Sequence, residues 1–439
     1  MTQGVLNFAV EGTDEQLTPR AGEAVFGEFL KALGLDRLIA KHLPQPGSNR
    51  GYAPYAFIQP LLLMLHGGGR YLDDVRMMAS DTALLSLLGI ANVPTADAIG
   101  KWLKRDSSTK QEGMEAVNRV LLKRHLSRIK EPLVLDIDAT MIESHKSIAR
   151  TTYKKFPGFA PIIGHINEGY VIHQEFREGN VAPADKNLAF VESCIAQLPP
   201  THTLQYLRAD SASYQAALFN YCDKHNITYT IGGHLDSSVL RSIQEITRWE
   251  SLSQKEGTVH HLEETVAEFI HTMQQTDKAF RMIVVKKRAT PILPHMEPML
   301  SDEEKHALVW EHYSVIATNS ETMSADEVVS FYRQRGETSE NRIKELKHGF
   351  QMHYLPTSNL EANALYFHIG TLAYNLFILF RRILDTRWQR HTIQTLRYKL
   401  YHIAGKVIRH ARRMILKIPS PYVEMVNTLR TKVYRIRLE

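Results

Sequence analysis

The chain has 439 residues, of which 53 are Lys or Arg and 47 are Asp or Glu, for a formal net charge of +6. This length predicts two or three domains, and 44% apolar with 23% charged residues excludes a wholly disordered or collagen-like chain. Two cysteines, Cys194 and Cys222, are too few for a disulfide scaffold or a multi-cysteine zinc module and fit a reducing compartment.

The first 130 residues have a helical pattern. Apolar residues recur at helical spacing over 21–39 and 57–65, and 84–88 is a further apolar helix segment. The sequence Pro-Thr-Ala-Asp at 94–97 opens another helix. We therefore expect a helical domain over 1–130.

From Glu131 the pattern changes to alternating strands and helices. The predicted elements are a strand over 132–142, a hairpin over 160–177, a helix over 188–198, a strand over 204–207, a helix over 214–225 and a strand over 227–232. This order predicts a mixed α/β core. Asp138 and Asp210 lie at the ends of two of its strands.

Residues 235–305 interrupt that alternation. The segment 280–287 is a clear strand, whereas 259–269 fits a helix or a strand equally well. A strand over 309–318 follows, and a capping box at 324–327 opens a helix whose continuation covers 331–350.

Positive charge is concentrated at the C-terminal end. Residues 381–439 hold 15 Lys or Arg and three acids, a net charge of +12, so the rest of the chain carries −6. Aromatic residues lie among the basic ones, and Ile408 and Ile415 are at helical spacing. A basic, ordered region with few acids favours a nucleic-acid partner through phosphate contacts. The alternative is a solvated helical face.

One segment is apolar enough to raise the question of a membrane. Residues 364–380 are 17 long, at the lower limit for spanning a bilayer, and contain His368, Thr371 and Asn375, which are costly in lipid. A buried helix is the better interpretation. The N-terminus has no pattern of a signal peptide, so we expect a cytosolic protein.

The strand over 132–142 carries an Asp-x-Asp-x-Thr motif that admits one alternative function. Asp136, Asp138 and Thr140 resemble the opening motif of haloacid-dehalogenase-like phosphatases, in which the first Asp is a nucleophile and the second a general acid. That family also needs a downstream acidic pair on a loop, and no such pair follows Asp210.

A second interpretation combines Asp138, Asp210 and a Glu on the late helix. Phosphodiester chemistry uses two divalent cations roughly 3.5–4 Å apart, one at the attacking oxygen and one at the leaving oxygen. Carboxylates are hard oxygen ligands that suit magnesium.

Several short motifs in order carry a family resemblance. They are LDIDAT at 135–140, REGN at 177–180, LRADS at 207–211, VIATN at 315–319, YRQRG at 332–336, ENRIKELK at 340–347 and AYNLF at 373–377. This set resembles the DDE transposases of bacterial insertion sequences, in the insertion-sequence-four-like superfamily and its thirteen-eighty group.

The resemblance implies a set of site residues. Asp138, Asp210 and Glu340 would be the catalytic residues and the ligands of two Mg²⁺ ions, for which Mn²⁺ substitutes. Glu337 is the alternative to Glu340, because the gap after Arg335 is one residue longer than the family pattern. Asp136 would support the metal ligands from behind or be simply structural. The implied DNA-binding residues are Tyr332, Arg335, Lys344, Lys347, Arg381 and Arg382.

The resemblance also implies the architecture and the activity. We expect an α/β fold: an RNase H-like mixed sheet over 131–234 and 306–380, a β-rich insertion over 235–305, a preceding helical domain over 1–130 for DNA binding or dimerisation, and a basic helical region over 381–439. The expected function is cut-and-paste transposition by magnesium-dependent phosphodiester hydrolysis and strand transfer, as a homodimer on terminal inverted repeats and target DNA, without a membrane. The expected location is the bacterial cytoplasm and, when active, the nucleoid. A domesticated DNA-binding relative without catalysis is the alternative.

Overall fold

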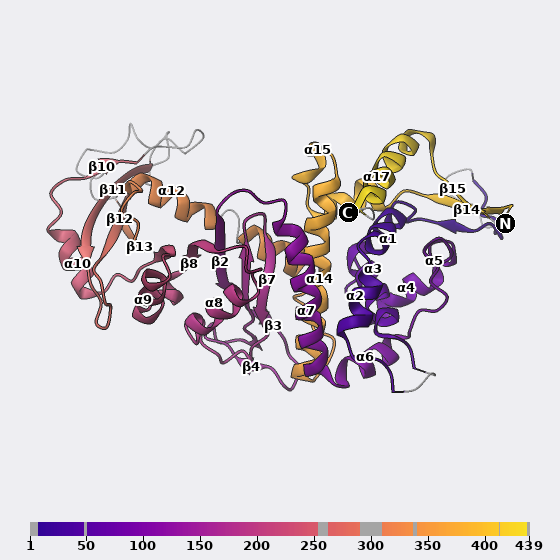
Figure 1. The fold of residues 1–439 in the computed structure, drawn as a ribbon, viewed down its shortest axis with the longest axis horizontal. Coiled ribbons are helices and arrows are strands. Elements are labelled where there is room, and N and C mark those ends of the chain that lie inside the picture. Colours follow the sequence, from indigo (N-terminus) through magenta and orange to yellow (C-terminus); the bar gives the residue numbers. More distant parts are fainter. Residues whose placement is uncertain are drawn as a thin grey trace. The chain divides into compact units, whose positions relative to one another are not determined.

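The structure is a computed structural model that describes residues 8–47, 51–252, 262–289, 310–336, 340–411 and 413–436 (Figure 1). The chain divides into two compact units, which we call unit 1 (Met1–Val117 and Glu345–Glu439) and unit 2 (Asn118–Lys344). Both ends of the chain therefore build one unit, and its middle builds the other. These boundaries differ from the four-part division expected from the sequence.

Unit 1 is mostly helical, as the apolar spacing of the N-terminal region predicted. Its N-terminal helices are α1 (Glu23–Ala32), α2 (Leu35–His42), α3 (Pro54–Gly67), α4 (Val75–Ser80), α5 (Thr82–Leu88) and α6 (Ala96–Lys104). Helix α7 (Ser107–Leu126) begins in unit 1 and ends in unit 2.

The long apolar segment near residue 370 forms the central helix of unit 1. Helix α14 (Leu360–Ile383) packs against α3 and α6. It is long and apolar enough to cross a membrane by length and composition, yet 89% of its most apolar window is buried inside the structure. Asn375 is fully buried. These features are those of a core helix.

The C-terminal region contains a β-hairpin, which corrects the expectation of a wholly helical tail. Strands β14 (Gly405–His410) and β15 (Arg413–Lys417) pair with each other, and β14 also pairs with β1 (Leu17–Thr18). Ile408 and Ile415, whose spacing suggested one helix face, are partners across the hairpin. A seven-residue spacing fits two helical turns and also this register, so spacing alone did not distinguish them.

Shorter helices complete the C-terminal region. They are α15 (Thr386–Gln389), α16 (Ile393–Leu396) and α17 (Val423–Ile436). Helix α17 packs on α1, and its Arg430 forms two hydrogen bonds of 2.7–2.8 Å with Glu28. Arg397, 8% exposed, donates to the carbonyl oxygens of Leu65 and His66 at 2.6 Å. The C-terminal region is thus part of the core of unit 1.

Unit 2 is built on a nine-stranded mixed sheet with the strand order β10-β11-β12-β13-β9-β8-β2-β6-β7. Its strands are β2 (Leu133–Ala139), β6 (Ile162–Ile166), β7 (Tyr170–Glu175), β8 (Leu204–Ala209), β9 (Thr228–Gly232), β10 (Glu250–Ser251), β11 (Leu262–His271), β12 (Phe280–Ala289) and β13 (Trp310–Thr318). The central pairs β2–β8 and β8–β9 are parallel, and the other pairs are antiparallel. Three short strands, β3 (Ile142–Glu143), β4 (Arg150–Thr151) and β5 (Pro157–Phe159), form a separate small sheet.

The region predicted as a β-rich insertion extends this sheet. Strand β13 pairs with the core strand β9, and β12 and β11 continue outward from it, so the described strands of 235–305 belong to the same nine-stranded sheet (Figure 1). The segment 259–269, which fitted a helix or a strand, is largely strand β11. Residues 253–261 and 290–309 of the expected insertion and strand lie outside the described residues.

Helices cover the two faces of the sheet. On one face, α8 (Asn187–Ala196) packs on β7 and α9 (Ala216–Lys224) on β9. Leu135 of β2 points to this face, because its side chain and that of Phe190 of α8 both lie next to Gly164. On the other face, α12 (Ala325–Arg335) crosses β8, β9 and the outer strands. Residues alternate between faces along a strand, so Asp136 and Asp138 both lie on the α12 face.

Helix α12 begins with the capping box that the sequence predicted. The Ser324 hydroxyl accepts a hydrogen bond from the Glu327 amide at 3.2 Å, and the Glu327 carboxylate accepts one from the Ser324 amide at 2.8 Å. The box fixes where α12 starts and hence where its last turn, with Arg335, lies above the sheet.

We predict that Ser324→Ala lowers the free energy of unfolding by about 1 kcal/mol, because it leaves an amide at the start of α12 without its acceptor. Urea unfolding followed by circular dichroism measures this. The matched control is Ser237→Ala at the first residue of α10 (Ser237–Gln244), where Asp236 supplies the cap. The control should change stability by less than about 0.5 kcal/mol. Equal effects of the two changes would contradict the role of the box.

Candidate active site

Parallel pairing of β2 with β8 brings two of the predicted acids together. Asp136 lies opposite Arg208, and Ile137 lies opposite Ala209. The next positions along the two strands are Asp138 and Asp210. Partners in a parallel pair point to the same face, so both carboxylates lie on the α12 face at the carboxyl end of these strands.

A buried ion pair lies directly below these acids. Asp136 is fully buried, and its two carboxylate oxygens accept hydrogen bonds from Nε and Nη2 of Arg208 at 2.7 and 2.8 Å. Arg208 also donates from Nη1 to the carbonyl oxygen of Phe331 at 2.9 Å, and its guanidinium lies 4.7 Å from the centre of the Phe331 ring. The pair therefore joins β2, β8 and α12.

Two further groups approach Asp136 from other elements. Nη1 of Arg342, in α13 (Asn341–Lys344), is 3.7 Å from its carboxylate, and Nε2 of His165 is 4.0 Å away. Burial lowers the pKa of His165 well below its usual range, and the charges of Arg342, Arg335 and Arg208 lower it further. His165 is therefore neutral near pH 7 and adds no positive charge.

Arg208 was missed by the sequence analysis as a site residue. The signal was present, because Arg208 precedes Asp210 by two residues and Asp136 precedes Asp138 by two residues. On two neighbouring parallel strands, equal spacing places one pair of opposite charges and one pair of acids on the same face. Reading the two motifs together would have predicted both pairs.

Asp138 has the electrostatic environment of a functional carboxylate. Its pKa is raised to about 6, first by burial and then by the negative charges of Asp210 and Glu340, while Arg335 acts in the opposite direction. Nη2 of Arg335 lies 3.3 Å from Oδ1 of Asp138. The three acids implied by the resemblance thus lie near enough for the charges of two of them to affect the third.

The other two acids differ in their surroundings. Asp210 is half-buried just after β8, and its Oδ1 accepts a hydrogen bond from the Ala212 amide at 3.1 Å. Glu340 is exposed and directly precedes α13. Its alternative, Glu337, lies outside the described residues. Among the residues that the structure describes, no three Asp, Glu, His or Cys side chains are close enough together to hold one metal ion.

Three predicted DNA-binding residues lie in the same unit as the acids. Tyr332 is half-buried on α12, and its hydroxyl lies against Gly232 near the start of the turn after Asp210. Burial raises the pKa of Tyr332 and keeps it protonated near pH 7. Arg335 ends α12 beside Asp138, and Lys344 is exposed at the end of α13.

The remaining three predicted DNA-binding residues belong to unit 1. Lys347 is partly exposed in the π-helical turn Glu345–Gly349. Arg381 and Arg382 are partly exposed in the last turn of α14, and the Arg381 guanidinium lies 5.1 Å from the centre of the Phe377 ring.

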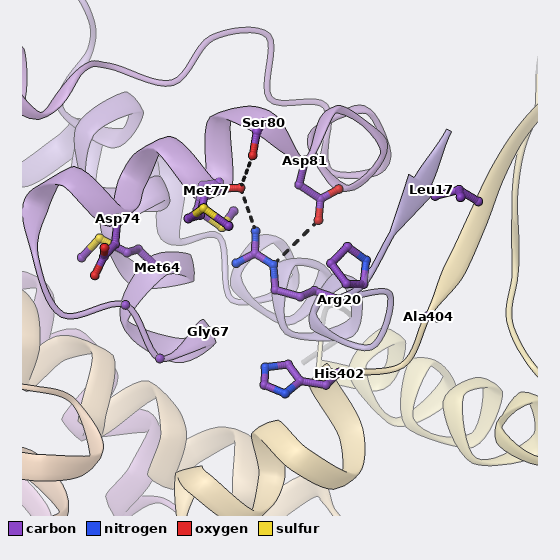
Figure 2. Close-up of a pocket in the computed structure, with 14 residues that line it drawn as sticks. Leu17, Arg20, Met64, Gly67, Asp74, Met77, Ser80, Asp81, His402 and Ala404 are labelled. Carbon is purple, nitrogen blue, oxygen red and sulfur yellow. Dashed lines mark hydrogen bonds and ion pairs between the residues drawn. The ribbon is translucent and has the colours of Figure 1, made fainter. Parts of the chain in front are cut away.

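A pocket of about 790 Å³ lies within unit 1 and contains none of the predicted site residues. Figure 2 shows Arg20 at its centre, between the carbonyl oxygen of Met77 and the carboxylate of Asp81. Gly67, Gly68 and Gly69 line it together with apolar residues. Arg20 is already paired with Asp81 and with Glu23, at 3.5–3.7 Å. The arginine that lines the pocket is therefore already engaged by two carboxylates.

The geometry argues against the phosphatase interpretation. That mechanism needs Asp136 as an accessible nucleophile, yet Asp136 has no exposed surface and both its oxygens are bonded to Arg208. Its buried ion pair with Arg208 fits a supporting or structural place for Asp136 instead.

The two aspartates of β2 should have opposite effects on stability. Because folding raises the pKa of Asp138 from 3.8 to about 6, its contribution is most favourable below about pH 4 and is lost as the pH rises through 6. We predict that Asp138→Asn stabilises the protein in EDTA at pH 8 by up to about 3 kcal/mol and has little effect at pH 4.

Asp136→Asn should instead destabilise the protein at pH 8 by about 3–5 kcal/mol, because it leaves the buried Arg208 charge without its partner. Urea unfolding of both variants at the two pH values measures the effects, with each variant serving as the control for the other. Destabilisation by Asp138→Asn at pH 8 would contradict the inference that the ionised Asp138 carboxylate lowers the free energy of unfolding.

Comparison with known proteins agrees with the motifs and the geometry. The family described as "Transposase DDE domain group 1" matches residues 5–438, which is nearly the whole chain. No curated protein is similar enough in sequence to count as a match. The match extends over both units and includes all three acids. The chain therefore belongs to the transposases with a DDE domain of group 1.

Proposed function

We propose that this transposase moves an insertion sequence by cut-and-paste transposition, with Asp138, Asp210 and Glu340 as its catalytic acids. The observation that carries the proposal is the parallel pairing of β2 with β8, which sets Asp138 beside Asp210, with Glu340 near enough for its charge to raise the pKa of Asp138. Active sites are where like charges are held close together against their repulsion.

The strand order supports an RNase H-like core. The antiparallel strands β7 and β6 lie beside the parallel strands β2, β8 and β9, which gives the order β7-β6-β2-β8-β9. The acids lie on β2 and directly after β8, at the centre of this order. Strands β10, β11 and β12 would then be the strands of the β-rich insertion, joined edge to edge with the core through β13.

The chemistry of these donors suits two magnesium ions, for which manganese would substitute, and the three carboxylates would have to come closer together than they lie in this structure to hold one ion. Three carboxylates provide hard oxygen ligands, and their mutual repulsion is what raises the pKa of Asp138 beyond the effect of burial. Bound there, two divalent cations supply activation of the attacking oxygen and stabilisation of the leaving oxygen. Asp138 and Asp210 would hold the cations from the sheet, and Glu340 from the segment that follows α12.

The surrounding side chains would position the DNA. Arg335 and Lys344 would contact backbone phosphates near the scissile bond, and the Tyr332 hydroxyl, which stays protonated, would donate a hydrogen bond to a phosphate oxygen. Phosphate contacts fix the register of the DNA without reading its sequence.

Unit 1 would supply the wider DNA surface. Lys347, Arg381 and Arg382 belong to it, as does the basic region 381–439. The N-terminal helices would read the terminal inverted repeats or mediate formation of a homodimer on DNA. We place the protein in the insertion-sequence-four-like superfamily, thirteen-eighty group, in the bacterial cytoplasm, associated with the nucleoid when active. A domesticated relative without catalysis would bind the same DNA and fail only the cleavage test.

We predict that Asp138→Asn, Asp210→Asn and Glu340→Gln each reduce cleavage of a duplex carrying the element's ends by about 10³-fold or more, because each removes a ligand worth several kcal/mol in the transition state. DNA affinity should change little, since no positive charge is lost. The ends are identified by sequencing inverted repeats beside the gene, and Mg²⁺-dependent strand nicking is measured on gels. The control is Glu192→Gln, which changes an exposed acid on α8. This variant should cleave the duplex normally. Full cleavage by Asp138→Asn would refute the site.

The basic C-terminal region generates a separate prediction about salt. Arg413 and Lys417 are exposed on β15. If both contact phosphates, the double change to Gln should reduce the log–log salt slope of DNA binding by about two units, at about 0.9 per phosphate. The control is Arg430→Gln, because the guanidinium of Arg430 is already bonded to Glu28. This change should leave the salt slope unaltered. Fluorescence anisotropy at several salt concentrations measures the slopes. An unchanged slope in the double variant would remove β15 from the DNA interface.

A further inference from the structure

Arg335 is the positively charged side chain beside Asp138 in the candidate active site. Its Nη2 is 3.3 Å from Oδ1 of Asp138 and 3.4 Å from the carbonyl oxygen of Ile137. The side chains of Arg335 and Asp138 are only 12% and 19% exposed. The guanidinium is therefore held against the sheet by one carboxylate oxygen and one carbonyl oxygen, both of which are oxygen donors of the kind that bind divalent cations.

The other arginines of this face pair with different carboxylates. Arg208 bonds to Asp136 through two nitrogens, and Arg342 lies 3.7 Å from the same carboxylate. Arg333, two residues before Arg335, bonds to Glu264 of β11 at 2.8 and 2.9 Å. Arg335 thus pairs with a proposed catalytic acid, whereas these contacts of the other three arginines are with Asp136 and Glu264.

The placement of Arg335 creates a competition. A guanidinium within 3.3 Å of Oδ1 and a divalent cation bonded to the same oxygen would bring like charges together in a largely buried place, which is costly. The side chain of Arg335 is long and ends α12, and the residue after it is the exposed Gly336, so a change of rotamer can carry the guanidinium away from the sheet. A DNA phosphate would receive it in the same two-nitrogen geometry that guanidinium uses with carboxylates.

We propose that Arg335 is an internal counter-ion of the acidic cluster, which holds Asp138 in the absence of DNA and must leave it before a divalent cation is held there. This inference rests on the proposed function. Its consequence is that DNA and the cation bind cooperatively: a phosphate that attracts Arg335 frees Asp138 for the cation, and by linkage the cation favours DNA to the same extent. Arg335 is a positioning residue in this scheme, and the free protein avoids loading metal when no substrate is present.

The test measures Mn²⁺ binding by the full-length protein with isothermal calorimetry, in the absence and presence of a short mixed-sequence duplex, since phosphate contacts do not depend on sequence. Without DNA, Arg335→Gln should bind Mn²⁺ on the order of tenfold more tightly than the unchanged protein. Arg335→Lys, which keeps the charge, should remain close to the unchanged protein. Arg333→Gln is the matched control, because it removes an equal charge from the same helix but not from Asp138.

The duplex gives the second reading. It should strengthen Mn²⁺ binding by the unchanged protein and by Arg333→Gln, and it should strengthen binding by Arg335→Gln to a clearly smaller extent. Equal Mn²⁺ affinity of Arg335→Gln and the unchanged protein, or the absence of coupling to DNA in the unchanged protein, would overturn the inference. The second measurement needs no variant and so does not depend on Arg335→Gln folding.

Failure of the proposed function has a different signature. If Asp138→Asn binds Mn²⁺ as tightly as the unchanged protein, with and without DNA, then the metal site is elsewhere and both proposals fall. If Asp138→Asn loses Mn²⁺ binding while Arg335→Gln gains none, the metal site stands and only the counter-ion role of Arg335 is refuted.

Discussion

The buried ion pair between Arg208 and Asp136 is the contact on which the candidate active site depends. It ties two parallel strands to each other and, through the Phe331 carbonyl oxygen, to the helix above them. A charge buried without its partner is expensive, so the pair strongly favours this one register of β2 against β8. The register in turn places Asp138 beside Asp210.

Two carboxylates that are only two residues apart on β2 have opposite electrostatic surroundings. Asp136 is surrounded by positive groups and stabilises the fold. Asp138 lies near Asp210 and Glu340, with Arg335 as compensation, and its pKa is raised by burial and by the charges of these two acids. In the proposed site, stability and function are thus carried by different residues, and the ion pair of Asp136 with Arg208 offsets the cost of holding like charges together.

The two ends of the chain fold together in unit 1, which changes the meaning of the basic C-terminal region. Arg397 is buried against the carbonyl oxygens at the end of α3, and Arg430 is bonded to Glu28, so some of the positive charge is used within the unit. The exposed residues of β15 remain available to DNA. Net charge counted along the sequence therefore overestimates the charge that a phosphate backbone would meet.

The sequence by itself indicated the family, predicted most of the elements and supplied the three acids that we propose for the site. Periodicity predicted the helices of the N-terminal region and the strands around Asp138 and Asp210, and the capping box predicted the start of α12, because these features depend on neighbouring residues. Short motifs in a fixed order indicated the transposase family, which the family match over residues 5–438 then showed. The role of Arg208 was also encoded, in a spacing that becomes informative once the two strands are known to be neighbours.

Only the tertiary structure decided how distant segments combine. The continuation of the sheet from β9 into β13, and the pairing of β14 with β1, involve residues separated by about 90 and 390 positions, and no local pattern specifies such partners. The hairpin at Ile408 and Ile415 shows the same limit, since one spacing serves both a helix and a strand pair. The ion pair of Arg335 with Asp138 likewise joins residues far apart in sequence. Burial and charge, which select among such pairings, arise only when the chain has folded.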